Sequence, residues 1–304
     1  KGTDISPDWM VNALAYNDNF SFALEIDNLK DRLRRYNFSG ISRTALFRCY
    51  QSAFDDKMYI DQANIEKLAK RSDFADIVKE TTPYIEKSVK FLYQELNVID
   101  YKLLPYNTQL IFLMTFFKKV ASPSESQIKA LKKWFWVTSY ANYFTIYSLS
   151  NQRRAFEHFV EYIRGYEDDM VFMDATKQAF TTLSFPERVS LASVRCRSLL
   201  LFELQHYRNV MGAMPQRRGL NLRKLTVKVE GTPANIVPYM GSERKVRWSL
   251  HDSLDLHAED DSLYEAFMLP SGCINKEEML KKRRELLIEK EKSFVESLGL
   301  KYSE

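Results

Sequence analysis

One stretch of the chain is apolar on almost every side of a helix, and this stretch most constrains the fold. It lies between Pro105 and Pro123, begins after a predicted cap at Asn107, and is closed by Lys118-Lys119. A helix without a polar face lies buried between other helices, and this run is too short to cross a bilayer. The sequence therefore predicts a central buried helix, whose apolar residues are Leu110, Ile111, Phe112, Leu113, Met114, Phe116 and Phe117.

A second helix is predicted directly after this one. Ser122 is its expected N-cap, Pro123 occupies the first helical position and Glu125 completes a capping box. Its aromatic cluster, Trp134-Phe135-Trp136, has two interpretations: packing in the core, which we favour because bulky aromatic side chains dominate buried cores, and stacking on nucleic-acid bases.

The rest of the chain is also patterned mainly for helices. Only nine of 304 residues are glycine, about half the usual share, which argues against an all-β fold. Apolar spacing and capping residues predict further helices over about 6–16, 24–37, 42–53, 61–70, 83–96, 150–165, 186–211 and 275–298. The alternation at Leu225, Val227 and Val229 predicts a short strand within a loop-rich span. We expect a mainly α fold, with a helical domain over 1–211 and a small loop-rich α+β module over 212–304.

Basic residues are concentrated in one part of the chain. The formal net charge of the chain is only +4. Between Met214 and Arg247, however, there are eight basic residues and only two acidic ones, Glu230 and Glu243. This excess predicts a contact surface for DNA phosphates; a solvated basic loop, or a partner for Glu167-Asp168-Asp169, is the alternative. The predicted DNA-binding residues are Arg217, Arg218, Arg223, Lys224, Arg244, Lys245 and Arg247.

Cysteine usage and the chain start indicate a cellular setting. The three cysteines are far apart and form no CxxC pair, which predicts a reduced, cytoplasmic protein. We find no signal peptide or transmembrane pattern, so no membrane partner is expected. The abrupt start Lys1-Gly2-Thr3-Asp4 is typical of a piece of a longer protein.

Several short motifs occur in the order found in one known family. They are Lys1-Gly2-Thr3-Asp4-Ile5-Ser6 at the start, Leu104-Pro105-Tyr106 before the buried helix, Lys133-Trp134-Phe135-Trp136, and Tyr143 in a helix approaching Arg153. Over roughly 1–165 the chain resembles the helical middle of the GmrSD-like restriction proteins. The resemblance implies an antiphage protein with an upstream ParB-like domain that hydrolyses a nucleotide and, often, a C-terminal HNH nuclease.

The C-terminal part resembles the HNH region of the same family. Ala234-Asn235-Ile236-Val237-Pro238, followed by Ser242 and Arg244-Lys245, is similar to the family's Ala-Asn-Leu-Thr-Pro-Leu and Asn-Arg-Lys segments, with Glu243 in place of the later asparagine. His257, Phe267, Arg283-Arg284 and Phe294 are similar to its closing helix. The resemblance implies that Asn235 is the motif's central asparagine.

The chain departs from the family at the sites of chemistry. It contains neither Asp-Gly-Gln-Gln-Arg, the nucleotide-hydrolysing signature, nor Asp-His-His-Ile-Phe-Pro, which supplies a metal ligand and a general base. An HNH site needs a histidine base and a metal-holding side chain, so His251 and His257, both after Asn235, are the candidate substitutes. The HNH-like module is therefore expected to be degenerate or incomplete, with candidate catalytic residues Asn235, His251 and His257 and an unknown metal-ligand set.

Two functions are consistent with this sequence. The first is the C-terminal portion of an antiphage restriction protein. The resemblance implies that it engages modified phage DNA and couples an upstream NTP-binding domain to an HNH-like nuclease using Mg²⁺ or Mn²⁺. The second is a non-catalytic helical module that forms a homo-oligomer or binds a partner protein of a defence complex.

Overall fold

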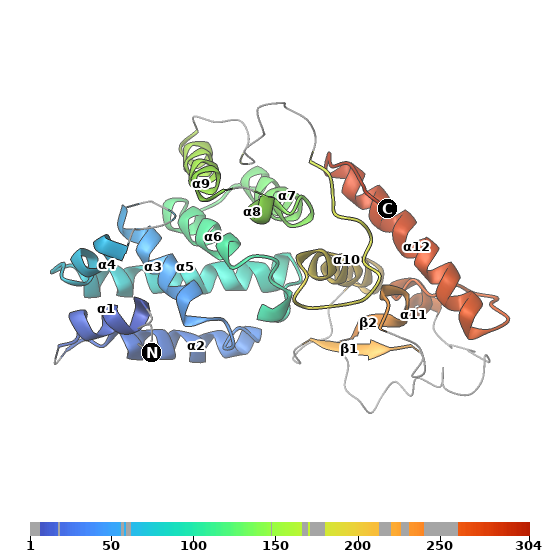
Figure 1. Ribbon diagram of the computed structural model, residues 1–304, viewed down its shortest axis with the longest axis horizontal. Helices are drawn as coiled ribbons and strands as arrows, with labels where there is room; N and C mark the ends of the chain where they lie inside the picture. Colours follow the sequence, from blue (N-terminus) through green and yellow to red (C-terminus); the bar gives the residue numbers. More distant parts are fainter. Residues whose placement is uncertain are drawn as a thin grey trace, which may run out of the picture. The chain divides into compact units, whose positions relative to one another are not determined.

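The fold is mainly helical, as predicted. The computed structural model describes residues 7–17, 19–55, 58, 62–146, 148–165, 170, 180–212, 220–225, 231–239 and 261–304. Within these ranges the chain forms twelve α-helices, three short 3-10 helices and two strands (Figure 1). In the same ranges, no helix combines the length and apolar character that a membrane span requires.

The chain divides into two compact units, and the first comprises residues 1–95, 106–135 and 144–176. The predicted buried helix, α6 (Asn107–Lys119), lies at its centre. Phe112 of α6 packs its ring against Trp134, Phe144, Phe156 and Phe159, with ring centroids 5.0–5.4 Å apart. The other helices of this unit are α1 (Pro7–Ala15), α2 (Phe22–Leu33), α3 (Arg43–Asp55), α4 (Gln62–Ala69), α5 (Phe74–Glu95), most of α7 (Glu125–Tyr140) and α8 (Tyr143–Ile146), and α9 (Leu149–Arg164).

The second unit comprises residues 96–105, 136–143 and 177–304. It contains the end of α7 together with α10 (Val194–Met211), β1 (Asn221–Lys224), β2 (Ile236–Tyr239), α11 (Asp261–Ala266) and α12 (Lys276–Ser297). The strands pair antiparallel, with Asn221 opposite Tyr239 and Lys224 opposite Ile236. An apolar cluster connects the strands, the loop after α11 and α12. Its buried residues are Leu225, Val237, Phe267, Leu269 and Met279. The units thus do not follow the predicted boundary after residue 211, because α10 belongs with the C-terminal elements.

The aromatic cluster of α7 is a packing element. Trp134, Phe135 and Trp136 are all buried, which agrees with the favoured interpretation, and none of them presents a ring face for base stacking. Trp136 packs edge-on against Phe294 of α12 with ring centroids 5.0 Å apart. Aromatic pairs in this geometry add stability beyond the apolar area that they bury.

Two helix starts differ from the sequence prediction in the residue that caps them. The capping box of α7 is built by Ser124 and Gln127, not by Ser122 and Glu125: the Gln127 amide donates to Ser124 Oγ at 3.2 Å, and the Ser124 amide donates to Gln127 Oε1 at 2.9 Å. A glutamine completes such a box as well as a glutamate does, so Ser124 and not Ser122 caps the helix. In α9 the cap is Ser148, whose Oγ accepts from the Asn151 amide.

Two longer helices have different bounds for a packing reason. Pro83 was expected to begin a helix, but it lies inside α5, which starts at Phe74. A proline inside a helix removes one hydrogen bond; here the burial of Phe74, Val78 and Thr82 on one side of the preceding turns offsets that loss. Conversely, α10 starts at Val194 and not near Pro186, because Ser193 Oγ accepts from the Cys196 amide and caps it there.

The predicted strand is displaced along the chain. Strand β1 ends at Lys224, Leu225 follows it in the core, and Val227 and Val229 lie outside the described residues. The partner strand β2 begins directly after Asn235. The described residues here form a two-stranded antiparallel pair, and the predicted HNH-like module stays a prediction.

Candidate functional site

The described candidate residues lie on the β1–β2 pair. Asn235 ends the 3-10 turn Pro233–Asn235, and its side chain is 0% exposed. Lys224 is exposed at the end of β1, while only the backbone of Arg223 is described, opposite Val237. The remaining candidates lie outside the described residues: His251, His257, Arg217, Arg218, Arg244, Lys245 and Arg247.

A fully buried arginine holds the turn that carries Asn235. Arg283 of α12 donates from Nη1 to the carbonyl oxygens of Pro233, Ala234 and Ile236 at 2.7, 2.9 and 3.2 Å. Its Nε donates to the Phe267 carbonyl at 3.1 Å. An arginine has five N–H donors in a rigid fork, so one side chain fixes the turn before β2 and the turn after α11 at once.

The backbone of this turn leaves no carbonyl from Thr232 to Ile236 without a donor. The Thr232 carbonyl accepts from the amides of Asn235 and Ile236, at 3.0 and 3.1 Å. The Asn235 carbonyl accepts from the Leu225 amide at 2.8 Å, and Arg283 serves the other three. Buried backbone groups must be paired in this way to avoid a desolvation penalty, so the turn is rigid and depends on Arg283.

The charge of Arg283 is balanced by Glu203 of α10. Arg283 Nη2 and Glu203 Oε2 are 2.7 Å apart, and both side chains are buried. Burial raises the pKa of the Glu203 carboxyl to about 7, against the opposing effect of the Arg283 charge. The other oxygen, Oε1, is buried without a hydrogen-bond partner among the described residues. Since solvent cannot reach this carboxyl, its perturbed pKa is a property of the core and not of an exposed general acid.

A second buried pair joins the same two helices. Arg195 of α10 donates from Nη1 and Nη2 to the two oxygens of Glu291 in α12, at 2.7 and 2.6 Å. The hydroxyls of Tyr140 and Tyr302 donate hydrogen bonds to the same carboxylate, at 2.8 and 2.9 Å. Burial of the phenol, together with the Glu291 charge, raises the pKa of Tyr140 well above its ordinary value. Every acceptor site of Glu291 is thereby used.

The two ion pairs are built from the same charge pattern on both helices, an arginine followed by a glutamate at the same spacing. On α10 an arginine precedes a glutamate by eight residues, Arg195 and Glu203, and on α12 Arg283 precedes Glu291 by the same interval. Arg195 pairs with Glu291 and Glu203 with Arg283, so the helices run antiparallel and each charge meets its opposite. Arg195 is buried in spite of its charge because its partner lies on another helix.

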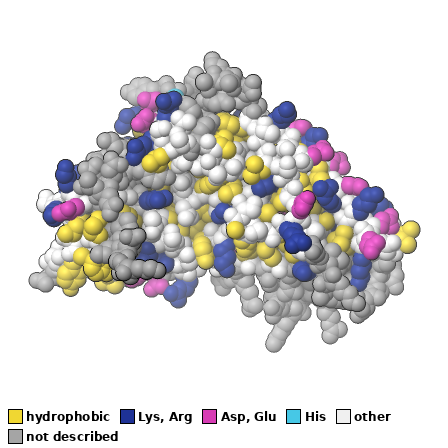
Figure 2. All heavy atoms as spheres, viewed as in Figure 1, with side chains coloured by type: hydrophobic (Ala, Val, Ile, Leu, Met, Phe, Trp, Pro, Cys, Tyr) yellow, Lys and Arg dark blue, Asp and Glu magenta, His cyan; other side chains and the backbone are white. Residues whose placement is uncertain are grey.

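These buried residues could have been found from one pattern that the sequence analysis did not use. Each of the two helices carries a charged residue on an otherwise apolar face and a residue of opposite charge eight positions later. This pattern on two helices indicates a pair of buried salt bridges between them. Exposed α12 charges follow a different rule, with i and i+4 neighbours such as Glu278 and Lys282 bonded on the surface. Figure 2 shows Lys/Arg and Asp/Glu side chains intermingled along this part of the molecule, so the outer face of α12 is not a basic surface.

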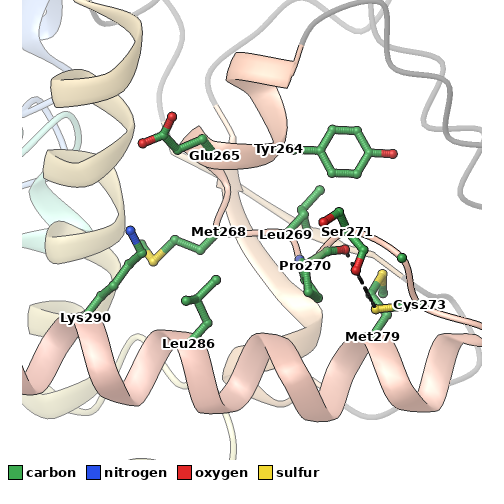
Figure 3. A pocket seen from close by; sticks show the side chains of 11 residues that line it. Tyr264, Glu265, Met268, Leu269, Pro270, Ser271, Cys273, Met279, Leu286 and Lys290 are labelled. Atoms are coloured by element: carbon green, nitrogen blue, oxygen red, sulfur yellow. Dashed lines mark hydrogen bonds between the residues drawn. The ribbon is translucent and has the colours of Figure 1, made fainter.

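A pocket of about 660 Å³ lies where the loop after α11 meets α12 (Figure 3). Glu265, Met268 and Lys290 line one end of it, and Tyr264 and Ser271 line the other. Behind it, Nε2 of His206 in α10 lies 2.9 Å from the Glu265 carbonyl oxygen. Burial lowers the pKa of His206, and the nearby Lys290 charge lowers it further.

The described residues do not offer a ready divalent-metal site. No group of three His, Cys, Asp or Glu side chains comes together in the ranges that the structure describes. Asn235 is buried, and Glu203 is bonded to Arg283, so neither presents an open oxygen to a cation. The expected Mg²⁺ or Mn²⁺ would have to be held with the help of His251 and His257, which lie outside those ranges.

No protein-family model matches the chain, and no curated protein or solved structure matches it either. The resemblance to the GmrSD-like proteins stays a prediction from the ordered residue matches.

Proposed function

We propose that this chain is the helical and C-terminal part of a GmrSD-like antiphage restriction protein, in which the basic segment 214–247 contacts DNA. In the whole protein the helices would couple an upstream NTP-hydrolysing domain to that contact. An HNH-like nicking activity, with His251 and His257 as its candidate histidines, belongs to the same proposal.

The observation that carries the proposal is the antiparallel pairing within the basic segment. Asn221 lies opposite Tyr239, so the chain enters β1 and leaves β2 at the same end of the pair. Arg217 and Arg218 precede that end in the sequence, and Arg244 and Lys245 follow it. Because Arg283 fixes the turn of the pair to the helices, both basic runs are attached to one rigid support. A rigid support lowers the entropy cost of bringing several cations to one phosphate backbone.

The test is charge reversal of the two basic runs, Arg217→Glu, Arg218→Glu, Arg244→Glu and Lys245→Glu together. Loss of four phosphate contacts should lower the slope of log K against log salt by about 3 to 4. Duplex DNA with and without modified bases is titrated at several salt concentrations. A matched control reverses four exposed lysines of the other unit, Lys79, Lys90, Lys129 and Lys133. Equal binding by the reversed chain and the wild type would remove the proposal.

The nuclease part has its own measurement. Supercoiled plasmid is incubated with the chain in Mg²⁺ or Mn²⁺, and nicking is compared for wild type, His251→Ala and His257→Ala. Nicking that disappears in either variant supports the HNH-like activity. Salt-sensitive DNA binding without any nicking would keep the DNA proposal and leave the module without nuclease activity.

A second function, a non-catalytic interaction module, is favoured by exposed aromatic side chains at the start of the chain. Trp9 is 60% exposed on α1 and Tyr16 is 65% exposed directly after it. Tryptophan and tyrosine are enriched in protein interfaces. Light scattering of wild type and of the Trp9→Ser, Tyr16→Ser variant tests this function: an oligomer that dissociates in the variant supports it, and a monomer at all concentrations removes the homo-oligomer.

A further inference from the structure

The pocket between the α11 loop and α12 combines an apolar floor with one cation, Lys290, that forms no salt bridge among the described residues. Leu286 and Lys290 project from α12 into it, one helical turn apart, and Met268 extends toward the end of Lys290 (Figure 3). Met279 and Leu269 complete the apolar floor. Ligand pockets of this size and character, mostly apolar with few polar groups, are typical of small-molecule sites.

Lys290 differs from the other lysines in the middle of α12. Lys282 is bonded to Glu278 one turn earlier, and Lys292 is bonded to Glu304. The residues three and four positions from Lys290 on either side are leucine, serine or phenylalanine, so no carboxylate lies at helical spacing. Among the described residues Lys290 forms no salt bridge, although it is half-buried. A half-buried ammonium without a counter-ion attracts an anion strongly, because its attraction is less screened than at the surface.

The backbone at the pocket is held in an unusual conformation. Met268 has φ of +52° although it is not glycine, and this left-handed conformation costs about 1 to 2 kcal/mol. Its amide donates to the Glu265 carbonyl at 3.0 Å, and the Leu269 amide donates to the Tyr264 carbonyl at 2.8 Å. The turn therefore fixes the Met268 side chain beside Lys290. Methionine is flexible and polarisable, so it adapts to apolar groups of different shape.

We propose that this pocket binds a small amphipathic anion, with its apolar body on Met268, Met279 and Leu286 and its carboxylate or phosphate head on the Lys290 ammonium. The exposed Glu265 carboxylate at the same end disfavours molecules with more than one negative charge near the head. The site is independent of the proposed DNA contact, since all its lining residues lie outside the basic segment.

The experiment uses octanoate as the probe and titration calorimetry of the whole chain as the measurement. Acetate lacks the apolar body and octanol lacks the charge, so both should bind at least about tenfold more weakly than octanoate. Octyl phosphate compared with octanoate decides which head group is preferred. No heat from octanoate at millimolar concentration, or equal affinity for octanol, would overturn the proposal.

Variants locate the binding in this pocket. Lys290→Met should weaken octanoate about tenfold and leave octanol unchanged, while Leu286→Glu should weaken both. Lys282→Met, on the same helix but paired on the surface, is the matched control and should bind octanoate as the wild type does. Octanoate bound near Lys290 should also raise the pKa of His206 in a proton NMR titration, because the ligand charge offsets the Lys290 charge that lowers it. Unchanged octanoate affinity in Lys290→Met would contradict the assignment.

Discussion

At the scale of single residues, the most consequential side chain is Arg283, and its importance is invisible in the sequence motif. The resemblance pointed to Arg283-Arg284 only as part of a closing helix. In the structure Arg283 is 0% exposed and carries the turn of Asn235, whereas Arg284 is exposed. A sequence shows two equal arginines; only the packing of α10 and the β2 turn against one of them separates their roles.

Glu203 gives a prediction for stability against pH. Its pKa is raised from 4.5 to about 7 in the folded chain, so the folded state binds a proton that the unfolded state has released. The contribution of Glu203 to the free energy of unfolding is complete below pH 4.5. It decreases by up to about 3 kcal/mol as the pH rises to about 7. His206, with its lowered pKa, acts in the opposite direction. Glu203→Gln should therefore remove the falling component when urea unfolding is measured from pH 4.5 to 8.

The control for this measurement is Glu285→Gln, an exposed change on α12. It should leave the wild-type profile in place. A Glu203→Gln chain whose stability follows pH as the wild type does would show that Glu203 is ionised throughout this range.

At the scale of elements, the sequence predicted where helices lie better than where they begin. The interior of α6 is determined by a long apolar pattern, which predicts a buried helix without knowledge of its neighbours. The start of α7 is set by a single hydroxyl, and the prediction chose Ser122 where the structure uses Ser124. Likewise, the alternation at Leu225 to Val229 located the small sheet within a few residues, but β1 lies earlier because its register depends on the partner strand β2 and on Arg283, which are distant in sequence.

Serine variants test which residue caps α7. Ser124→Ala removes the hydroxyl that accepts from the Gln127 amide and should cost about 1 kcal/mol of unfolding free energy. Ser122→Ala, two residues earlier and equally exposed, should cost less than about 0.5 kcal/mol. Both are measured by urea unfolding under one set of conditions. A larger loss for Ser122→Ala would place the cap where the sequence first indicated it.

At the scale of the whole molecule, the division into two units is the feature that the sequence least revealed. The predicted boundary followed the change of composition after residue 211. The observed units interleave three segments each, because contacts between residues far apart in sequence decide which helices share a core. Adjacent residues of α7 even fall on different sides of the division, with Phe135 in one unit and Trp136 in the other.

The cysteines provide a reporter for each unit. Cys49 is buried in the first unit and Cys196 in the second, and burial raises the pKa of the Cys49 thiol, so labelling of either requires opening. Arg283→Met leaves Glu203 without its partner and removes the arginine donor from four carbonyls, at a cost of about 3 to 5 kcal/mol. It should accelerate labelling of Cys196 more than labelling of Cys49, as followed by mass spectrometry. Arg284→Met is the control; equal acceleration at both cysteines would mean that the units open together.

The shared order of charge on α10 and α12, arginine before glutamate, also selects the antiparallel direction of the helix pair. If α12 were turned end for end against α10 with the same spacing, Arg195 would face Arg283 and Glu203 would face Glu291. Two buried like-charge contacts would then replace two salt bridges, a penalty of several kcal/mol for each contact. Apolar side chains alone distinguish the two directions poorly, because hydrophobic attraction is non-directional. The four charges thus reject the inverted helix pair during folding, whatever they contribute to the stability of the correct one.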